Sequence, residues 1–199
     1  MKTSVKTNAS QPARLMLIGA RLAFPQLDEP KQFQGQGKFR YDATALIPKE
    51  DKATLAAVEA AIRAAAVAKW GEAKADQAVK GLKAAGKVAL QDGDAKSDWD
   101  GFTDHMYIGA HAQKNAPPTL LDAARNVLPR DTSVIYAGCF CVFSLEFWAQ
   151  DNEFGKRINC TVRGVQFYQD GDSFGAGAPA SEDEFEAIDG ADEAPDDFA

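Results

Sequence analysis

The chain has 199 residues, of which 45% are hydrophobic and 26% are charged, and its net charge is −7. These values are ordinary for a soluble globular protein and indicate one domain with appendages. The net charge alone argues against a nucleic-acid partner, but the charges are unevenly distributed. Eleven of the 29 acidic residues follow Arg163, the last basic residue, so residues 1–163 carry 18 acids against 22 bases, a net of +4. The sequence therefore predicts a basic body with an acidic tail.

The first twelve residues are polar and lack the apolar centre of a secretory signal. The nearby run "LMLIGARLAF" is too short to span a membrane and contains Arg21. The chain has three cysteines, an odd number that does not suit a disulfide framework. We therefore expect a cytoplasmic protein without a membrane partner, in which residues 1–13 form a disordered arm.

Two strands and a helical segment are predicted in the first half. The stretch Leu15–Phe24 is apolar and is expected to end as a strand at the following proline. The stretch Lys38–Ile47 alternates between apolar and polar side chains, which predicts a half-buried strand with Lys38 and Arg40 on its outer face. Apolar residues then recur at helical spacing over about residues 50–86, where we expect a helical insertion packed on a sheet.

The second half is predicted to be mostly strand. Gln91–Asp104 is acidic and rich in turn residues, which indicates a solvated loop. His105–Lys114 and Pro118–Ala123 follow as two short strands. Val134–Trp148 and Arg157–Tyr168 are longer strands, joined by the loop "AQDNEFGK" into a hairpin. Several strands with turns between them, closed by a long hairpin, predict a mainly β small barrel with inserted helices.

The two faces of this long hairpin differ in character. One face of the first strand is apolar throughout and includes Cys139 and Cys141, and Cys160 lies on the matching face of the second strand. The opposite face interleaves arginines with aromatic residues. Its members are Tyr136, Phe140, Trp148, Arg157, Arg163 and Phe167. Because guanidinium groups hold phosphates while aromatic rings stack on unpaired bases, this pattern is typical of a surface for single-stranded nucleic acid.

Residues elsewhere in the chain extend the predicted DNA-binding surface. They are Lys31, Lys38, Arg40, Tyr107, Lys114 and Lys156. The alternative for the aromatic residues is that Tyr136 and Phe140 pack beneath the inserted helices, since large apolar side chains are usually buried. From the alternation alone, the two interpretations are evenly balanced for any one ring.

Catalytic and metal-binding patterns are weak. The two histidines, His105 and His111, have no paired carboxylate or nucleophile beside them, and no glycine-rich phosphate loop follows a strand. The three cysteines lack a fourth zinc ligand and are better explained as buried thiols. We expect no enzymatic activity, no metal and no cofactor.

Several stretches occur in a specific order: "RLAFPQLDEPK", "YDATALIPKED", "YIGAHAQKNAPPTLLDA" and "YAGCFCVFSLEFWAQDNEFGKRINCTVRGVQFYQDGDSFGAG". In this order and spacing, the chain resembles a family of tailed-phage single-stranded-DNA-binding proteins. The resemblance implies an α+β, OB-like barrel of five to six strands over residues 14–170, and sequence-independent binding of single strands. It also implies a flexible acidic tail over residues 171–199. The helical insertion departs from the usual OB order, because it follows the second strand.

The last nineteen residues, "SEDEFEAIDGADEAPDDFA", include nine acids and no base. We expect this tail to compete with DNA for the basic surface and, once displaced, to recruit replication or recombination proteins. The residues assigned to that partner contact are Asp192, Glu193, Asp196, Asp197 and Phe198. The alternative function is a protein-interaction or virion accessory module that binds no DNA. The sequence does not predict the oligomeric state.

Overall fold

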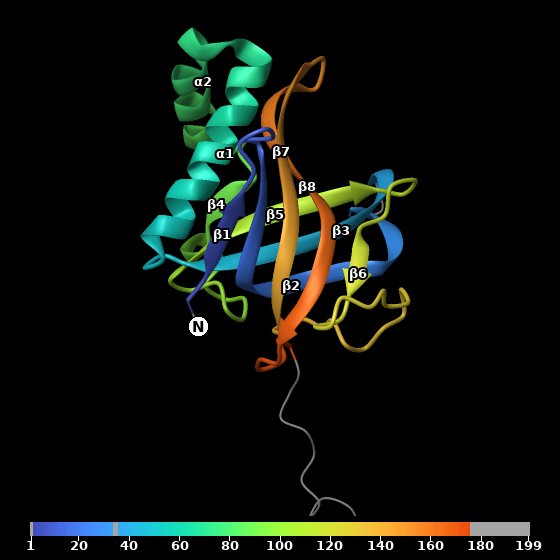
Figure 1. The fold of residues 1–199 in the computed structure, drawn as a ribbon. Coiled ribbons are helices and arrows are strands. Elements are labelled where there is room, and N and C mark those ends of the chain that lie inside the picture. Colours follow the sequence, from blue (N-terminus) through green and yellow to red (C-terminus); the bar gives the residue numbers. More distant parts are fainter. Residues whose placement is uncertain (1, 34–35, 176–199) are drawn as a thin grey trace, which may run out of the picture.

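The computed structural model describes residues 2–33 and 36–175. Three strands are followed by two alanine-rich helices and then by the remaining strands (Figure 1). The strands are β1 (Ser4–Thr7), β2 (Arg14–Phe33), β3 (Gln36–Pro48), β4 (Leu90–Asp92), β5 (His105–Gln113), β6 (Thr119–Leu121), β7 (Phe140–Asn152) and β8 (Gly155–Gln169). The helices are α1 (Lys52–Trp70) and α2 (Glu72–Ala84), with a short 3-10 turn, η1 (Asp94–Lys96). Neither α-helix of the described chain is long and apolar enough to cross a membrane.

Five of the strands close into a barrel. Antiparallel pairs join β3 to β5, β2 to β3, β2 to β7, and β7 to β8. The barrel closes where β5 meets β8 in parallel, at the single pair His111 and Thr161. In Figure 1, β3 and β5 cross behind β7 and β8 at a steep angle. The predicted OB-like barrel, mainly β with helices inserted, is therefore confirmed.

The helical hairpin lies between the second and third barrel strands, β3 and β5, as the sequence order predicted. The buried face of α1 includes Val58, Ala61, Ile62 and Ala65 and joins the barrel core. Small alanine side chains let the helix backbone approach the strands closely, so the helix extends the core. In Figure 1 the two helices stand at one side of the barrel, near the tip of the β7–β8 hairpin.

The interior of the barrel is apolar and includes all three cysteines. Cys139, Cys141 and Cys160 are fully buried, as the apolar face of the long hairpin predicted. Burial raises the pKa of the Cys160 thiol, so this thiol stays protonated and acts as a small hydrophobic side chain.

Strand β2 continues past Pro25, where the sequence predicted its end. Between the pairs Ala23–Thr44 and Gln26–Asp42, two residues of β2 lie opposite one residue of β3. This is a β-bulge, which is where a strand tolerates a proline because no ladder hydrogen bond is needed from it. Phe24 at the bulge has a φ of +47°. The bulge allows one long strand to pair with β1 and β7 at its start and with β3 at its end.

The β7–β8 hairpin differs from its predicted form in two ways. Its connection is a two-residue turn at residues 153–154, because both strands extend into the predicted loop. The register also shifts, since Ser144 pairs with Gly164 but Leu145 pairs with Val162. Arg163 is the extra residue, and the side chains after it change faces. The prediction that Phe167 faces outward is therefore wrong: Phe167 pairs with Cys141 and packs against the core.

Residues 2–13 are ordered, whereas the sequence predicted a disordered arm over residues 1–13. Strand β1 pairs antiparallel with β2. Just before it, the backbone N–H and the hydroxyl of Thr3 donate hydrogen bonds of 2.6 and 2.7 Å to one carboxylate oxygen of Asp51. Both residues are buried. The contact joins the chain start to the residue that precedes α1.

Residues 171–175 also belong to the folded body, although the sequence assigned them to the tail. Phe174 packs against a second buried cluster, formed by Ala23, Leu46, Phe102 and Tyr107. The guanidinium of Arg21 lies 4.2 Å from the Phe174 ring centroid and donates to the Asp172 carbonyl at 2.6 Å. The rest of the predicted tail, residues 176–199, lies outside the described residues.

We predict that Asp51→Ala lowers the free energy of unfolding by about 1.5–3 kcal/mol, the range for hydrogen bonds to a charged group. Burial acts to raise the pKa of Asp51, but the two hydrogen bonds from Thr3 outweigh it and hold the pKa below its usual value. The contribution is thus complete above about pH 4 and is lost as the pH falls through the folded-state pKa.

Urea unfolding at neutral and acidic pH measures this contribution. The matched control is Asp98→Ala, which removes an exposed acid and leaves stability unchanged. Equal stability of Asp51→Ala and the unmodified chain at pH 7 would contradict the prediction.

Candidate nucleic-acid interface

A continuous groove crosses the outer face of β3, β5 and β8. It consists of two adjoining depressions of about 770 and 510 Å³ that share Arg40, His111, Arg157 and Asn159. The first depression extends to Phe24, Lys96, Trp99 and Tyr107, and the second to Lys38, Trp148, Gln150 and Phe154. The shared residues lie at the point where the barrel closes, so the groove runs from one side of the closure to the other.

The floor of the groove depends on residues 87–89, which lie between α2 and β4. Because β5 and β8 pair at one position, a gap separates them beyond it. The Ile158 N–H donates to the Lys87 carbonyl at 3.0 Å, and the Ala89 N–H donates to the Ile158 carbonyl at 2.8 Å. On the other side, the Gly109 N–H donates to the Ala89 carbonyl at 3.1 Å. The segment therefore bridges the gap and satisfies backbone groups on both strands.

The groove is basic. Its described lining includes five basic residues and one acidic residue. The basic residues are Lys38, Arg40, Lys87, Lys96 and Arg157. The acidic residue, Asp42, forms an ion pair of 2.9 Å with Arg40. This excess of positive charge suits a polyanion.

Aromatic side chains lie beside these charges at the β7–β8 end. The Trp148 ring is 38% exposed, and its N–H donates to the Thr161 hydroxyl at 3.0 Å, which fixes its orientation. The His111 ring meets it edge to face, with centroids 6.4 Å apart. Phe154, at the turn, is 79% exposed. An exposed, oriented indole beside Lys38 and Arg157 has the arrangement that base stacking requires.

His111 contributes a ring rather than a charge to the groove. Burial lowers its pKa, and the nearby Arg40 lowers it further, against a smaller opposing effect of Asp42. Since the usual histidine pKa is near 6.5, His111 is neutral at pH 7.

The β7–β8 hairpin is braced from the side that faces away from the groove. The Trp70 ring N–H, at the end of α1, donates to an Asp151 carboxylate oxygen at 2.8 Å. Lys156 forms an ion pair of 3.3 Å with the same oxygen, and its ammonium lies 5.9 Å from the Trp70 ring. These contacts hold the pKa of Asp151 below its usual value, with the Trp70 hydrogen bond as the main favourable cause. The inserted helix thus supports the hairpin that bears Trp148.

The structure brings five of the predicted binding residues to the groove. They are Lys38, Arg40, Tyr107, Trp148 and Arg157. Of these, Tyr107 is only 8% exposed, and its hydroxyl donates to Gln91 at 2.8 Å. Two further predicted residues lie at the end of the β2–β3 hairpin. Lys31 is the antiparallel partner of Arg40, and the Lys114 ammonium lies 5.5 Å from the Phe39 ring.

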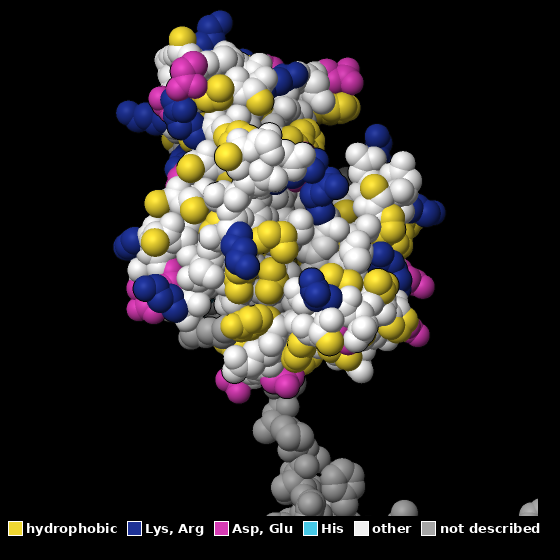
Figure 2. All heavy atoms as spheres, in the orientation of Figure 1, with side chains coloured by type: hydrophobic (Ala, Val, Ile, Leu, Met, Phe, Trp, Pro, Cys, Tyr) yellow, Lys and Arg dark blue, Asp and Glu magenta, His cyan; other side chains and the backbone are white. Residues whose placement is uncertain are grey.

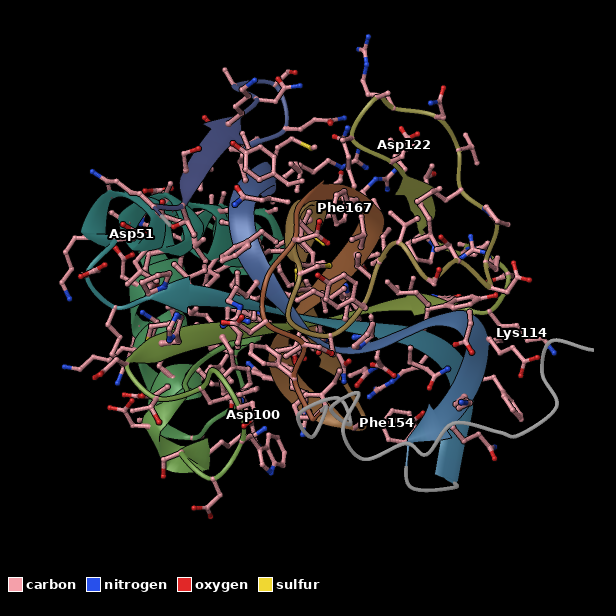
Figure 3. The ribbon with its side chains drawn as sticks, turned by 90° about the horizontal axis from the view of Figure 1, so that it is seen from below. Asp51, Asp100, Lys114, Asp122, Phe154 and Phe167 are labelled. Atoms are coloured by element: carbon pink, nitrogen blue, oxygen red, sulfur yellow. The ribbon has the colours of Figure 1, made fainter. Side chains whose placement is uncertain are left out.

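The other predicted residues lie elsewhere. The Tyr136 hydroxyl donates to the Asp170 carboxylate at 2.9 Å, and Phe140 lies beneath Arg21. These two rings pack at the base of the tail and not under the helices. Arg163 forms an ion pair of 2.9 Å with Glu146. Phe167 packs against the barrel core, and its label lies apart from those of Phe154 and Lys114 in Figure 3.

The outer face over β1, β2 and β7 also carries basic residues. Figure 2 shows lysine and arginine side chains in the middle of this face, while acidic side chains lie toward its margins. The positive charge of the body is therefore spread beyond the groove, and the aromatic side chains distinguish the groove from the rest of the surface.

Sequence reasoning missed several residues of the groove. Lys87 and Lys96 lie outside regular strands, where alternation gives no orientation. His111 was considered only for catalysis, and Phe154 was placed in a long loop. The glycine after "EF" was the signal that could have placed Phe154 at the tip of a tight hairpin. Gly155 has a φ of +94°, and glycines in this conformation favour tight hairpins.

A family model described as "Enterobacter phage Enc34, ssDNA-binding protein" matches residues 13–199. The chain belongs to this family. A relative from Acyrthosiphon pisum secondary endosymbiont phage 1, "Putative protein p50", is 34% identical over 181 residues, which cover 90% of this chain and 96% of the relative.

Solved structures show the same fold. The single-stranded DNA-binding protein from bacteriophage Enc34, in complex with ssDNA, matches with a TM-score of 0.71 and 24% identity over 87% of this chain and 99% of that one. The bacteriophage T7 protein gp2.5, a single-stranded DNA binding protein, matches with a TM-score of 0.52 and 12% identity over 94% of this chain and all of that one. At these identities, the two structures bear on the fold alone.

We predict that Asp151→Ala increases amide hydrogen exchange across residues 149–158, because it removes the shared acceptor of Trp70 and Lys156. Exchange in the buried part of β2 and β3 stays unchanged, since local opening does not require global unfolding. Mass spectrometry of exchanged peptides measures both. Asp151→Asn is the matched control: it keeps an acceptor for the Trp70 N–H and retains more protection. Unchanged exchange at the hairpin in Asp151→Ala would show that the brace is unimportant.

Proposed function

We propose that this protein binds single-stranded DNA without sequence preference, during phage DNA replication or recombination in the cytoplasm of the infected bacterium. The observation that carries the proposal is the groove, which places Lys38, Arg40 and Arg157 beside the oriented ring of Trp148. OB folds bind oligonucleotides over their second and third strands and between the loops after the first and fourth strands. The groove occupies this position, and the family membership supports the same ligand.

The mechanism follows from the kinds of side chain in the groove. Lysine and arginine neutralise phosphates and release their counterions, which gives affinity that does not depend on sequence. Trp148 offers a flat surface to any unpaired base, since every base has a π face. Bases in a duplex are already stacked and do not reach such a ring. Preference for single strands is thus a property of the aromatic residues, and affinity is mostly a property of the cations. The protein needs no catalytic group for this function.

The acidic tail is proposed to compete with DNA for the groove. The position of the last described residues supports this proposal. The Gly175 N–H donates to the Asp100 carboxylate at 2.9 Å, and Asp100 follows Trp99, which lines one end of the groove. A tethered polyanion that starts there has a high effective concentration at the groove. Once DNA displaces it, the tail is free to recruit replication or recombination proteins. The assigned residues Asp192, Glu193, Asp196, Asp197 and Phe198 lie outside the described residues.

Fluorescence polarisation of a labelled oligothymidylate across a salt series tests the function. We expect affinity to fall as salt rises, with a slope of about 2 in log Kd against log salt if three cations each neutralise one phosphate. A chain that ends at Gly175, which keeps the packed Phe174, binds more tightly than the full chain. The matched control is a full-length chain in which the tail acids are replaced by Asn and Gln, and it tightens equally. Absence of binding by every form at low salt would refute the function.

Neighbouring residues on β8 provide a second test. Arg157→Ala weakens binding and lowers the salt slope by about 0.7, the loss of one phosphate contact on a single strand. Lys156→Ala, which removes an equal charge facing Trp70, changes the slope less. Equal effects of Arg157→Ala and Lys156→Ala on the salt slope would contradict the proposed path of the DNA.

Trp148→Ala costs about 1–3 kcal/mol of binding free energy, whereas Trp148→Phe keeps a stacking ring and costs less.

A further inference from the structure

A second group of exposed aromatic rings lies at the end of the groove away from Trp148. Phe24, at the β2 bulge, is 52% exposed, and Trp99, in the loop after η1, is 45% exposed. Their ring centroids are 4.8 Å apart, and the rings meet edge to face. Both residues line the first depression and neither lines the second, so the shared residues at the barrel closure lie between this pair and Trp148.

The pair is held in place from beneath. Phe102 is 1% exposed, and its ring centroid lies 5.5 Å from that of Trp99 and 5.7 Å from that of Phe24. Phe102 belongs to the same buried cluster as Tyr107 and Phe174. The exposed rings therefore stand on a packed base. Ordering the rings before a ligand arrives reduces the entropy that binding has to overcome.

A positive charge accompanies these rings. The Lys96 ammonium lies 4.5 Å from the Trp99 ring centroid and 4.5 Å from that of Tyr107. Lys96 lines the groove along with both rings. A cation within reach of an exposed indole repeats the combination found at the other end of the groove, where Arg157 and Lys38 accompany Trp148.

The backbone of Phe24 shows that its exposure is built into the strand. Leu22, two residues earlier, is buried in the barrel core, so regular alternation would direct Phe24 into the barrel as well. The bulge instead turns the Phe24 side chain outward, and the Phe24 backbone has a φ of +47°. Because Phe24 precedes a proline, its backbone is restricted further. Bulges re-aim side chains next to binding sites, and strained positions of this kind gather at such sites.

We propose that Phe24 and Trp99, with Lys96, form a second base-stacking site, so that one DNA strand runs along the groove from Trp148 to Trp99. The ligand is an unpaired base stacked on an exposed ring, with its neighbouring phosphate on Lys96. This inference rests on the proposed function and adds the far end of the DNA path. Its consequence is that a short oligonucleotide fits on the Trp148 end alone, while a longer one also engages Trp99.

The three tryptophans allow each place to be observed separately by fluorescence. In three full-length variants, two of Trp70, Trp99 and Trp148 are replaced by Phe and the third is retained. Stacking of a base quenches indole emission. Saturation with a long oligothymidylate at low salt quenches the emission of the variant that retains only Trp99 and that of the variant that retains only Trp148. The variant that retains Trp70 stays unquenched, because that ring is bound to Asp151 on the other side of the hairpin.

Quenching of Trp148 without quenching of Trp99 would overturn this inference and leave the proposed function intact. Absence of DNA binding by the unmodified chain would overturn both.

Affinity gives an independent measurement. Trp99→Ala and Phe24→Ala each weaken binding of a long oligothymidylate by about 5- to 150-fold, the range for loss of one stacked base. The loss shrinks as the oligonucleotide is shortened across the range of about 4–16 nucleotides typical of one OB fold. The control is Tyr168→Ala, which removes a ring that is 46% exposed and does not line the groove. A loss of affinity that is independent of length would indicate a general structural effect and contradict the second site.

Discussion

The closure of the barrel between β5 and β8 is the constraint on which the groove depends. These strands pair in parallel at His111 and Thr161 alone, and the backbone of residues 87–89 supplies the hydrogen bonds that continue the wall. Closure brings Arg40 of β3 and Arg157 of β8 to one surface, although the two are far apart in the chain. A barrel paired along the whole β5–β8 edge would have no inserted segment, and its outer surface there would be flatter.

The inserted helices have a structural role that follows from their position. They occupy the connection between β3 and β5, and this connection also supplies the bridging segment and the loop that holds Trp99. At its other end, α1 contacts the β7–β8 hairpin through Trp70 and Asp151. One insertion therefore supports the groove floor and both of its ends. This explains how the fold accommodates helices at an unusual position without losing the binding face.

Much of the fold follows from local patterns in the sequence. The alternation in Lys38–Ile47 placed Lys38 and Arg40 on the outer face of β3 correctly, because that strand pairs with β5 in unbroken register. The same reasoning failed after Arg163, because a bulge reverses alternation and can be located only by counting residues on both paired strands. The outward orientation predicted for Phe167 is therefore wrong, although the strand itself was predicted and Arg163, which precedes the change of face, is exposed as expected.

Other residues required knowledge of contacts between distant elements. Lys156 and Arg157 are neighbours on β8, so alternation puts them on opposite faces, but it does not show that Trp70 of α1 lies over Lys156 or that Arg157 lines the groove. Tyr136 and Phe140 are rings that the sequence left undecided, and their partners at the base of the tail, Asp170 and Arg21, come from segments distant in sequence. Alternation predicts a face, and the tertiary fold decides what covers it.

The bulge at Phe24 has a consequence for which changes of chain length the protein tolerates. Deletion of one residue there would restore regular alternation and turn the side chains that follow, beginning with Gln26, to the opposite face of β2. Polar groups would enter the barrel and apolar groups would leave it. The two-residue turn of the β7–β8 hairpin lies at an exposed tip, where insertions are absorbed at little cost. Insertions and deletions are thus expected at the tip of the β7–β8 hairpin, which borders the groove, and are not tolerated in β2, which forms part of the groove wall.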